Sequence, residues 1–514
     1  MAASLFSPLG RVATPRLLSR ACFFPGSTTT TPAILAAVRW NSTGPKPKSP
    51  LGALADTITR VPKSPAPLQP GFAPIKPTTS AKSDPKSDPV YESTSDAHSS
   101  SFPKVSDKKV GYWLLGSALS VFGIVVWGGL TRLTESGLSI TEWRPVTGSF
   151  YPMTQEAWDE EFSKYRASPE FALLNPRMTL DEFKKIYFME WSHRLWGRFI
   201  GVSFLLPTIY FIARKRVTKS MALKLVGICG MIGFQGFIGW WMVASGLKDD
   251  LFAPGSHPRV SQYRLTAHLG AAFVVYSAML LSGLSILREH RWLKDPAAAT
   301  KLIQELSNSR LRTFKRLVTA LSALVFVTAM SGALVAGLDA GLIYNEFPWM
   351  GLGLTPPKKE LFDPFYSHTP DQSDLWWRNM LENPSLVQLD HRCLAVTTFT
   401  AIIGLFAFAR YNTRLRAALP RPAKKGLTGV VHIAWMQVAL GISTLIYMVP
   451  THLAATHQAG SLALLSMSLI LWSRLRTPRG LVKMVNTKAA AGPRAASRVT
   501  RPQSAPSKAA IAAA

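Results

Sequence analysis

The sequence predicts an all-α integral membrane protein, with eight transmembrane helices in two tandem, pseudo-symmetric four-helix bundles. Three observations carry this prediction: apolar blocks of membrane length, a regular alternation of charge between the loops, and an internal repeat. Of the 514 residues, 47% are hydrophobic and only 17% are charged. The apolar residues are gathered in long blocks rather than spaced at helical or strand periods, which excludes a set of ordinary soluble domains.

The apolar blocks begin at Gly111 and are each about twenty residues long, which matches a helix that crosses a hydrocarbon core of about 30 Å. A block of this length and composition is typical of a transmembrane helix. We expect spans at about residues 111–131, 194–213, 222–246, 265–287, 316–337, 392–409, 427–449 and 453–473.

The loops between these spans alternate in charge. The two long loops on one side are acidic, with ten acidic against seven basic residues in 132–192 and eight against three in 338–390. The segments on the other side are basic, with five basic and no acidic residues in 214–224, eight against three in 288–316, six against none in 410–425, and nine against none after residue 473. This positive-inside bias places both termini on one side of the membrane. It also accounts for the net charge of +29, so we expect no nucleic-acid partner.

The N-terminus contains several arginines and many Ser and Thr residues, and no acid before Asp56. This composition is typical of a mitochondrial transit peptide, so we expect a multi-pass protein of the mitochondrial inner membrane with both termini in the matrix. The Pro- and Ser-rich segment that follows cannot bury enough apolar surface to fold. The predicted organisation is a transit peptide (1–45), a disordered matrix segment (46–105), an N-terminal four-helix half (106–287), a basic matrix linker (288–315), a C-terminal four-helix half (316–473) and a basic disordered tail (474–514).

The two halves are related by a repeat. GGLTRLTESGL (128–138) aligns without a gap with GALVAGLDAGL (332–342), and each run ends a span with an acid followed by Gly-Leu. Further along, HR at 193–194 matches HR at 391–392, QGFIG (235–239) matches QVALG (437–441), and TAHLG (266–270) resembles ATHQAG (455–460). A duplicated unit with an even number of spans keeps its orientation, so the halves are related by an axis along the membrane normal.

Four of the ten histidines occupy corresponding positions in the two halves. His193, His268, His391 and His457 each open an even-numbered span, close to its N-terminal end and near the intermembrane-space side. Ionisable residues inside a membrane are costly and indicate a functional site. His432 and His452 have no counterpart in the other half, and we interpret them as structural.

Two facing histidines in each half favour haem iron with two axial imidazoles, because zinc requires further ligands and a di-iron site requires a second Glu-x-x-His. Small residues such as Gly128, Gly129, Gly233, Gly236 and Gly239 would make room for the ring, although they also suit close helix packing. Arg194, Arg264 and Arg392 lie beside the histidines and are candidate partners of the haem propionates, or ordinary interfacial arginines.

The halves differ at the position three residues before the first histidine. This position is Glu190 in the first half and Gln388 in the second. Residues i and i+3 share a helix face, so Glu190 is expected in the same cavity as His193. A carboxylate can take or give a proton, whereas an amide cannot. The alternative is that Glu190 orients His193 or pairs with Arg194. The asymmetry predicts a reactive first half and an electron-relaying second half.

These motifs in combination resemble the haem A synthase family, in the mitochondrial form required for assembly of cytochrome c oxidase. The resemblance covers about residues 110–473 and is carried by GGLTRLTESGLS, EWSHRLWGR, TAHLG, LDHR and THQAG. Some bacterial members carry a cysteine pair in the first external loop. This chain has no cysteine between residues 132 and 192, so it resembles the cysteine-free class.

The resemblance implies oxidation of the C8 methyl of haem O to a formyl group by successive hydroxylations. It further implies that His193 and His268 hold the substrate haem, that Glu190 is essential, and that His391 and His457 ligate a haem b cofactor. A matrix ferredoxin is the implied electron donor. Haem O synthase, other assembly factors, membrane lipid and a second copy of the chain are candidate partners. How oxygen is activated stays open. One alternative is that an imidazole leaves the iron, and the other is that electrons are withdrawn from the substrate haem, which water then attacks.

Two other functions use the same histidines. A di-haem membrane cytochrome would transfer electrons without oxidising haem, and a haem carrier or assembly factor would bind haem and pass it on. A haem O synthase is excluded because the chain has no aspartate-rich motif for a prenyl diphosphate. Product analysis separates the two remaining alternatives from the oxidase.

Overall fold

The computed structural model describes residues 102–491, apart from 146, 149 and 254–257. In these residues the chain is helical and forms no β-strand. The eight predicted spans are confirmed, because eight helices are long and apolar enough to cross a membrane. They are α2 (Lys108–Leu133), α5 (Leu180–Ala213), α6 (Lys219–Val243), α7 (Gln262–Lys294), α9 (Leu311–Gly337), α12 (Pro384–Tyr411), α14 (Arg421–Ile446) and α15 (Thr451–Arg474).

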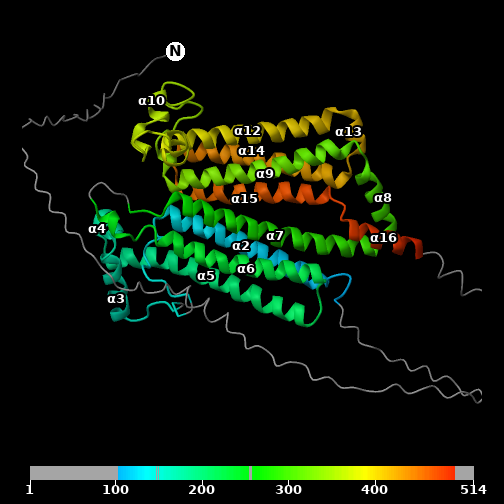
Figure 1. The fold of residues 1–514 in the computed structure, drawn as a ribbon, viewed down its shortest axis with the longest axis horizontal. Coiled ribbons are helices and arrows are strands. Elements are labelled where there is room, and N and C mark those ends of the chain that lie inside the picture. Colours follow the sequence, from blue (N-terminus) through cyan, green and yellow to red (C-terminus); the bar gives the residue numbers. More distant parts are fainter. Residues whose placement is uncertain (1–101, 146, 149, 254–257, 492–514) are drawn as a thin grey trace, which may run out of the picture. The chain divides into compact units, whose positions relative to one another are not determined.

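The eight long helices form two groups, which are the two halves of the repeat (Figure 1). The first half contains α2, α5, α6 and α7, and the second contains α9, α12, α14 and α15. The halves meet where α2 and α7 pack against α9 and α15. Of the eight most apolar windows, that of α7 is 44% buried and that of α14 only 11%, so α7 is central and α14 faces outwards.

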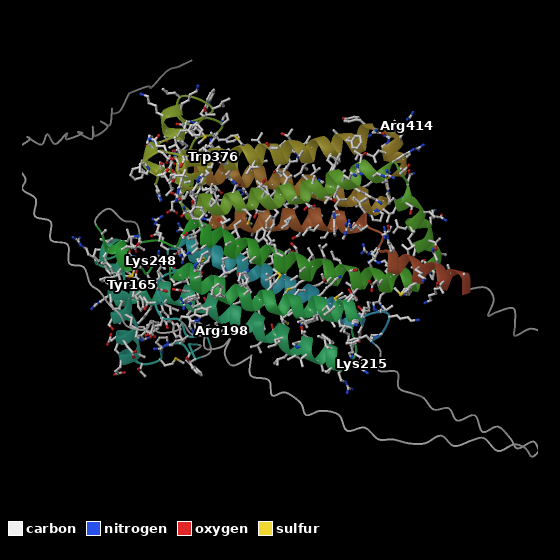
Figure 2. All side chains as sticks on the ribbon, in the orientation of Figure 1. Tyr165, Arg198, Lys215, Lys248, Trp376 and Arg414 are labelled. Atoms are coloured by element: carbon white, nitrogen blue, oxygen red, sulfur yellow. The ribbon has the colours of Figure 1, made fainter. Side chains whose placement is uncertain are left out.

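Short helices cover both ends of the bundle. At one end lie α3 (Gln155–Arg166), α4 (Pro169–Leu173) and α10 (Lys358–Leu361), and at the other lie α8 (Pro296–Ser307), α13 (Thr413–Ala418) and α16 (Arg479–Ala491) (Figure 1). Figure 2 places the basic residues Lys215 and Arg414 at the second end, and Tyr165 and Trp376 at the first. The remaining short elements are η1 (Asp249–Phe252), η2 (Ala340–Leu342), η3 (Pro364–Tyr366) and α11 (Leu375–Glu382).

Helix α5 begins at Leu180, well before the predicted start near residue 194. A capping box between Thr179 and Glu182 starts it, and Phe183 and Tyr187 then pack into an aromatic cluster with α3. This outer part is stabilised by its cap and its packing rather than by hydropathy. The prediction that His193 opens its helix was therefore wrong, because the residue lies well inside α5.

The predicted tail is more ordered than expected, and the predicted linker contains a helix. Helix α7 continues to Lys294 and is followed by α8, while α16 occupies part of the tail predicted to be disordered from residue 474. Leu481 and Val485 are one helical turn apart, and they pack with Trp292, Ala299 and Ile303 in a small apolar cluster. The predicted transit peptide, nearly all of the segment 46–105, and residues 492–514 lie outside the described residues.

Replacing Val485 by Asp should release α16 from α8. Val485 is fully buried, so the variant places an unpaired carboxylate in the apolar cluster. We expect backbone hydrogen exchange in α16 to become about tenfold faster or more, measured by mass spectrometry. The control is Thr487→Asp, on the exposed face of the same helix. Equal exchange in both variants would contradict the packing described.

Candidate functional site

All four histidines singled out from the sequence line one cavity of about 2300 Å³ within the described part of the bundle. His193 on α5 and His268 on α7 form the pair of the first half, and His391 on α12 and His457 on α15 form the pair of the second half. Within each pair the two imidazoles are close enough to interact electrostatically. The structure thus brings together residues that are far apart in the sequence.

A glycine on the preceding long helix faces each histidine. A side chain there would meet the imidazole, because a Cβ atom built on the glycine would stand at most 3.4 Å from the ring carbon Cε1. The distances are 2.8 Å from Gly128 to His193, 3.4 Å from Gly239 to His268, 3.0 Å from Gly332 to His391, and 3.1 Å from Gly441 to His457. The four glycines occupy corresponding positions of the repeat, so the same close approach is built twice in each half.

The other glycines named from the sequence have different surroundings. Gly129 faces the side chain of Gln458, which donates a hydrogen bond of 3.0 Å to the carbonyl of Val125 and so joins the two halves. Gly233 and Gly236 line the cavity with open space beside them. Helix packing accounts for Gly129, whereas the latter two widen the cavity.

The histidine side chains have unused hydrogen-bonding capacity. The Nδ1 atoms of His193, His268 and His457 are buried without a partner, while that of His391 contacts Ser331 Oγ at 2.8 Å. A buried polar atom without a partner costs about 1–3 kcal/mol, which points to a ligand that holds the ring. Among the described residues no group of three or more His, Cys, Asp or Glu could hold a bare metal ion. Two imidazoles per half, in a largely apolar cavity, fit the axial ligation of haem.

Glu190 is buried, with 3% of its surface exposed, and both of its oxygens accept hydrogen bonds. Oε2 accepts from Ser139 Oγ at 2.7 Å and from the Ile140 amide at 2.8 Å. Oε1 accepts from Arg194 Nε at 3.0 Å and Nη2 at 2.6 Å. Its partners are therefore Arg194 and the start of the external loop. No hydrogen bond joins Glu190 to His193 among the described contacts.

Gln388 holds the corresponding loop of the second half by donating hydrogen bonds, whereas Glu190 accepts them from its loop. Its Nε2 donates to the carbonyls of Ala340 at 2.9 Å and Tyr344 at 3.1 Å. Tyr344 is the repeat counterpart of Ile140, whose amide donates to Glu190. The exchange of Glu for Gln thus accompanies an exchange of donors for acceptors in the loop.

The arginine after each first histidine binds the loop that follows α2 or α9 in the same way in both halves. Arg194 donates to the carbonyls of Ile140 at 2.7 Å and Glu142 at 3.0 Å. Arg392 donates to the counterparts of these residues, the carbonyls of Tyr344 and Glu346, both at 2.9 Å. Both arginines line the cavity, but these donors hold loop backbone.

Arg264, the third arginine named from the sequence, is placed differently. It donates to the carbonyl of Trp241 and lies over the indole ring of that residue, 4.4 Å from its centre. It is not among the residues that line the cavity. The expectation that it faces a haem carboxylate therefore has no support in the geometry.

An ionic network that the sequence did not reveal joins the two halves at the cavity. Arg259 pairs with Glu135 at 3.0 Å and also with Asp339, and Asp339 pairs with Arg132 at 3.1 Å. Glu135 and Asp339 are the acids that the repeat retains after α2 and α9, and both have positive φ, at 51° and 49°. The repeat of the acid in both halves could have indicated this network from the sequence. Arg259, which pairs with both acids, lies outside the repeated motif.

Glu170 on α4 is a second buried carboxyl group of the first half, with 4% of its surface exposed, and it lines the same cavity. Its Oε2 atom has no hydrogen-bond partner. Burial, followed by the nearby charges of Glu190 and Glu135, raises the pKa of Glu170 to about 8, while Arg259 and Arg132 oppose the shift. Nothing in the sequence distinguishes it from the other acids of its loop.

His432 and His452, which have no counterpart in the other half, lie at exposed positions. The Nδ1 atom of His432 contacts the carbonyl of Thr428 at 2.8 Å. Neither His432 nor His452 lines the cavity. Both cysteines among the described residues, Cys229 and Cys393, are free, and Cys229 lines the cavity.

The protein is a polytopic membrane protein with eight membrane-length helices in two repeated halves. Each half contributes a pair of histidines, each facing a glycine, to one shared interior cavity. The model of the family described as Cytochrome oxidase assembly protein matches residues 111–469, and the chain belongs to this family. The resemblance seen in the sequence motifs is therefore confirmed.

Several relatives are similar over most of the chain. Heme A synthase COX15 of Saccharomyces cerevisiae is 51% identical over 381 residues, which cover 74% of this chain and 78% of that protein. Heme A synthase COX15 of Homo sapiens is 44% identical over 375 residues, covering 73% and 84%. A Heme A synthase-mitochondrial ferredoxin fusion protein of Schizosaccharomyces pombe is 52% identical over 376 residues, covering 72% and 61%.

The stability of the protein should fall as pH rises towards 8. Glu170 has a folded pKa of about 8 against 4.5 for the free side chain, so between these values the folded state binds more protons than the unfolded state. We expect Glu170→Gln to remove a pH-dependent loss of a few kcal/mol, on the order set by that shift. Thermal unfolding between pH 5 and pH 9, with exposed Glu156→Gln as control, measures it. Parallel curves for wild type and Glu170→Gln would refute the buried protonated state.

Proposed function

We propose that this protein is a haem A synthase of the mitochondrial inner membrane, which converts haem O to haem A for cytochrome c oxidase. The observation that carries the proposal is the pair of glycine-backed histidine sites in one cavity, with Glu190 present in only one of them. The relatives named Heme A synthase, which include proteins of yeast and human, support it. The conversion is an oxidation, so the protein is an oxidoreductase.

We assign His193 and His268 to the substrate haem and His391 and His457 to a haem b cofactor. When bound, the haems supply the redox chemistry, and the protein orients them and controls protons around them. The asymmetry of the halves supports this division, since the halves share the histidines, the facing glycines and the loop-binding arginines. They differ in Glu190 and in the donors around it.

The hydrogen bonds of Glu190 suggest its part in the reaction. Four donor contacts match a carboxylate and leave it as a fixed negative charge beside the first histidine pair. The same contacts hold the external loop over the cavity. Arg194 and Arg392 share this second role, so we propose that they close the two sites rather than bind propionates directly.

We further propose that both termini lie in the matrix and that the histidines lie nearer the intermembrane-space side. The basic residues at the end marked by Lys215 and Arg414 support this orientation (Figure 2). A ferredoxin-type protein is the proposed electron donor. The fusion of a Heme A synthase to a mitochondrial ferredoxin in Schizosaccharomyces pombe supports it.

Protein purified after co-expression with a source of haem O should contain haem A and its alcohol precursor, identified by chromatography and mass. Replacing Glu190 by Gln should lower haem A formation about a hundredfold or more, in the range of a preorganised charge at a reaction site. Haem b retained by the second half shows that the variant is folded, and Glu156→Gln should behave as wild type. Only haem B in every sample, with haem O available, would favour the cytochrome or the carrier.

Replacing the facing glycines one at a time should disrupt the two proposed haem sites independently. Gly128→Ala should displace His193 and lower the haem bound in the first half, and Gly332→Ala should do the same in the second. The control is Gly116→Ala on the same helix as Gly128, where the added Cβ meets no atom within 4 Å. Haem per protein and the visible spectrum measure the effect. Full haem content in both test variants would rule out these imidazoles as ligands.

A further inference from the structure

The two buried carboxyl groups of the first half differ in their hydrogen bonds. Glu190 is held by donors on both oxygens, whereas Glu170 Oε2 is buried and accepts none. A buried carboxylate oxygen without a protein donor destabilises the charged form, so the neutral carboxyl is favoured. Glu170 is thus the carboxyl group at this cavity that is suited to hold an exchangeable proton.

The position of Glu170 links the cavity to the external surface. It lines the cavity from α4, a short helix of the external loop that is capped by Ser168. The short helix α4 also packs against η1, whose Asp249 and Asp250 are exposed to solvent. Glu170 therefore lines the cavity from a helix that contacts a water-exposed acidic turn.

The charged groups around Glu170 act on its pKa in opposite directions. Glu190 and Glu135 disfavour its ionisation, while Arg259 and Arg132 favour it. Tyr165 of α3 is the remaining titratable neighbour, and burial followed by Glu170 raises its pKa. Burial and the two acids outweigh the arginines and hold the pKa of Glu170 at about 8, close enough to neutrality for the proton to leave and return.

The proposed reaction requires such a group. Converting a methyl group to an alcohol with dioxygen consumes one O₂, two electrons and two protons, and yields the alcohol and one water. If water supplies the oxygen instead, one water is consumed, and two protons and two electrons leave. In either reaction, two protons must enter or leave the site for each hydroxylation.

We propose that Glu170 is the proton-transfer group of the first half, carrying protons between the cavity and water on the external side, while Glu190 stays a fixed charge. The inference rests on the proposed function for the reaction that uses these protons. Among the described residues of the second half, Glu360 on α10 accepts hydrogen bonds from Tyr344 and Ser385 on its two oxygens and does not line the cavity. Glu382 and Asp339 do line it, but Glu382 accepts hydrogen bonds from Tyr263 and Arg378, and Asp339 forms ion pairs with Arg132 and Arg259.

The test uses full-length protein loaded with haem, in wild type, Glu170→Gln, Glu170→Asp and the exposed control Glu156→Gln. Infrared difference spectra recorded from pH 6 to pH 10 report protonated carboxyl groups independently of turnover. Wild type and the control should lose a protonated-carboxyl band with a midpoint near pH 8, and Glu170→Gln should lack that band. Haem A formation should fall about tenfold or more in Glu170→Gln, with normal haem content and partial recovery in Glu170→Asp.

Several outcomes would overturn the proposal. If Glu170→Gln forms haem A at the wild-type rate with an unchanged pH profile, Glu170 carries no proton that limits the reaction. If the infrared band persists in Glu170→Gln, another group holds the proton. If Glu170→Gln loses haem together with activity, the role is structural. Failure of wild type to make haem A would instead refute the proposed function, and the infrared titration would still decide whether Glu170 exchanges a proton.

Discussion

The close approach of each histidine to a glycine is the constraint on which the rest of the structure depends. Backbone groups in a membrane must bond within helices, so the site can be shaped only by side chains and by helix spacing. At Gly128 and Gly332 the absence of a side chain lets an imidazole lie directly against the neighbouring helix. The repetition of this contact at Gly239 and Gly441 requires the helices of the two halves to be spaced alike.

The difference between the halves lies at their outer ends, where the external loops meet the helices. The arginines after His193 and His391 bind equivalent loop carbonyls, so the loops are anchored alike. The residues around these anchors then set the charge of each site. A buried carboxylate and a second buried carboxyl group line the cavity from the first half, and a neutral amide replaces the former in the second. The shared scaffold positions the histidines, and the loops supply the chemical difference.

Much of the fold was predictable because membrane helices are encoded locally, in length, hydropathy and flanking charge. The repeat also identified the four histidines that line the cavity. The start of α5 was missed because its outer part is held by a cap and by aromatic packing around Phe183, which hydropathy does not detect. The burial of Glu170 and the pairing of Arg259 with two distant acids depend on tertiary contacts, which leave no periodic signal in one sequence.

The arginine shared by the two repeated acids has a consequence for the history of the chain. Arg259 lies nine residues before His268, and the residue nine before His457 is Met448, so the second half has no equivalent cation. Two identical subunits would each have brought a copy of Arg259, or neither would. The fused chain has one copy, which pairs with both Glu135 and Asp339, while Arg132 of the first half also pairs with Asp339. The acid of the second half is therefore neutralised by two arginines of the first half, and the duplicated units have become a single, interdependent molecule.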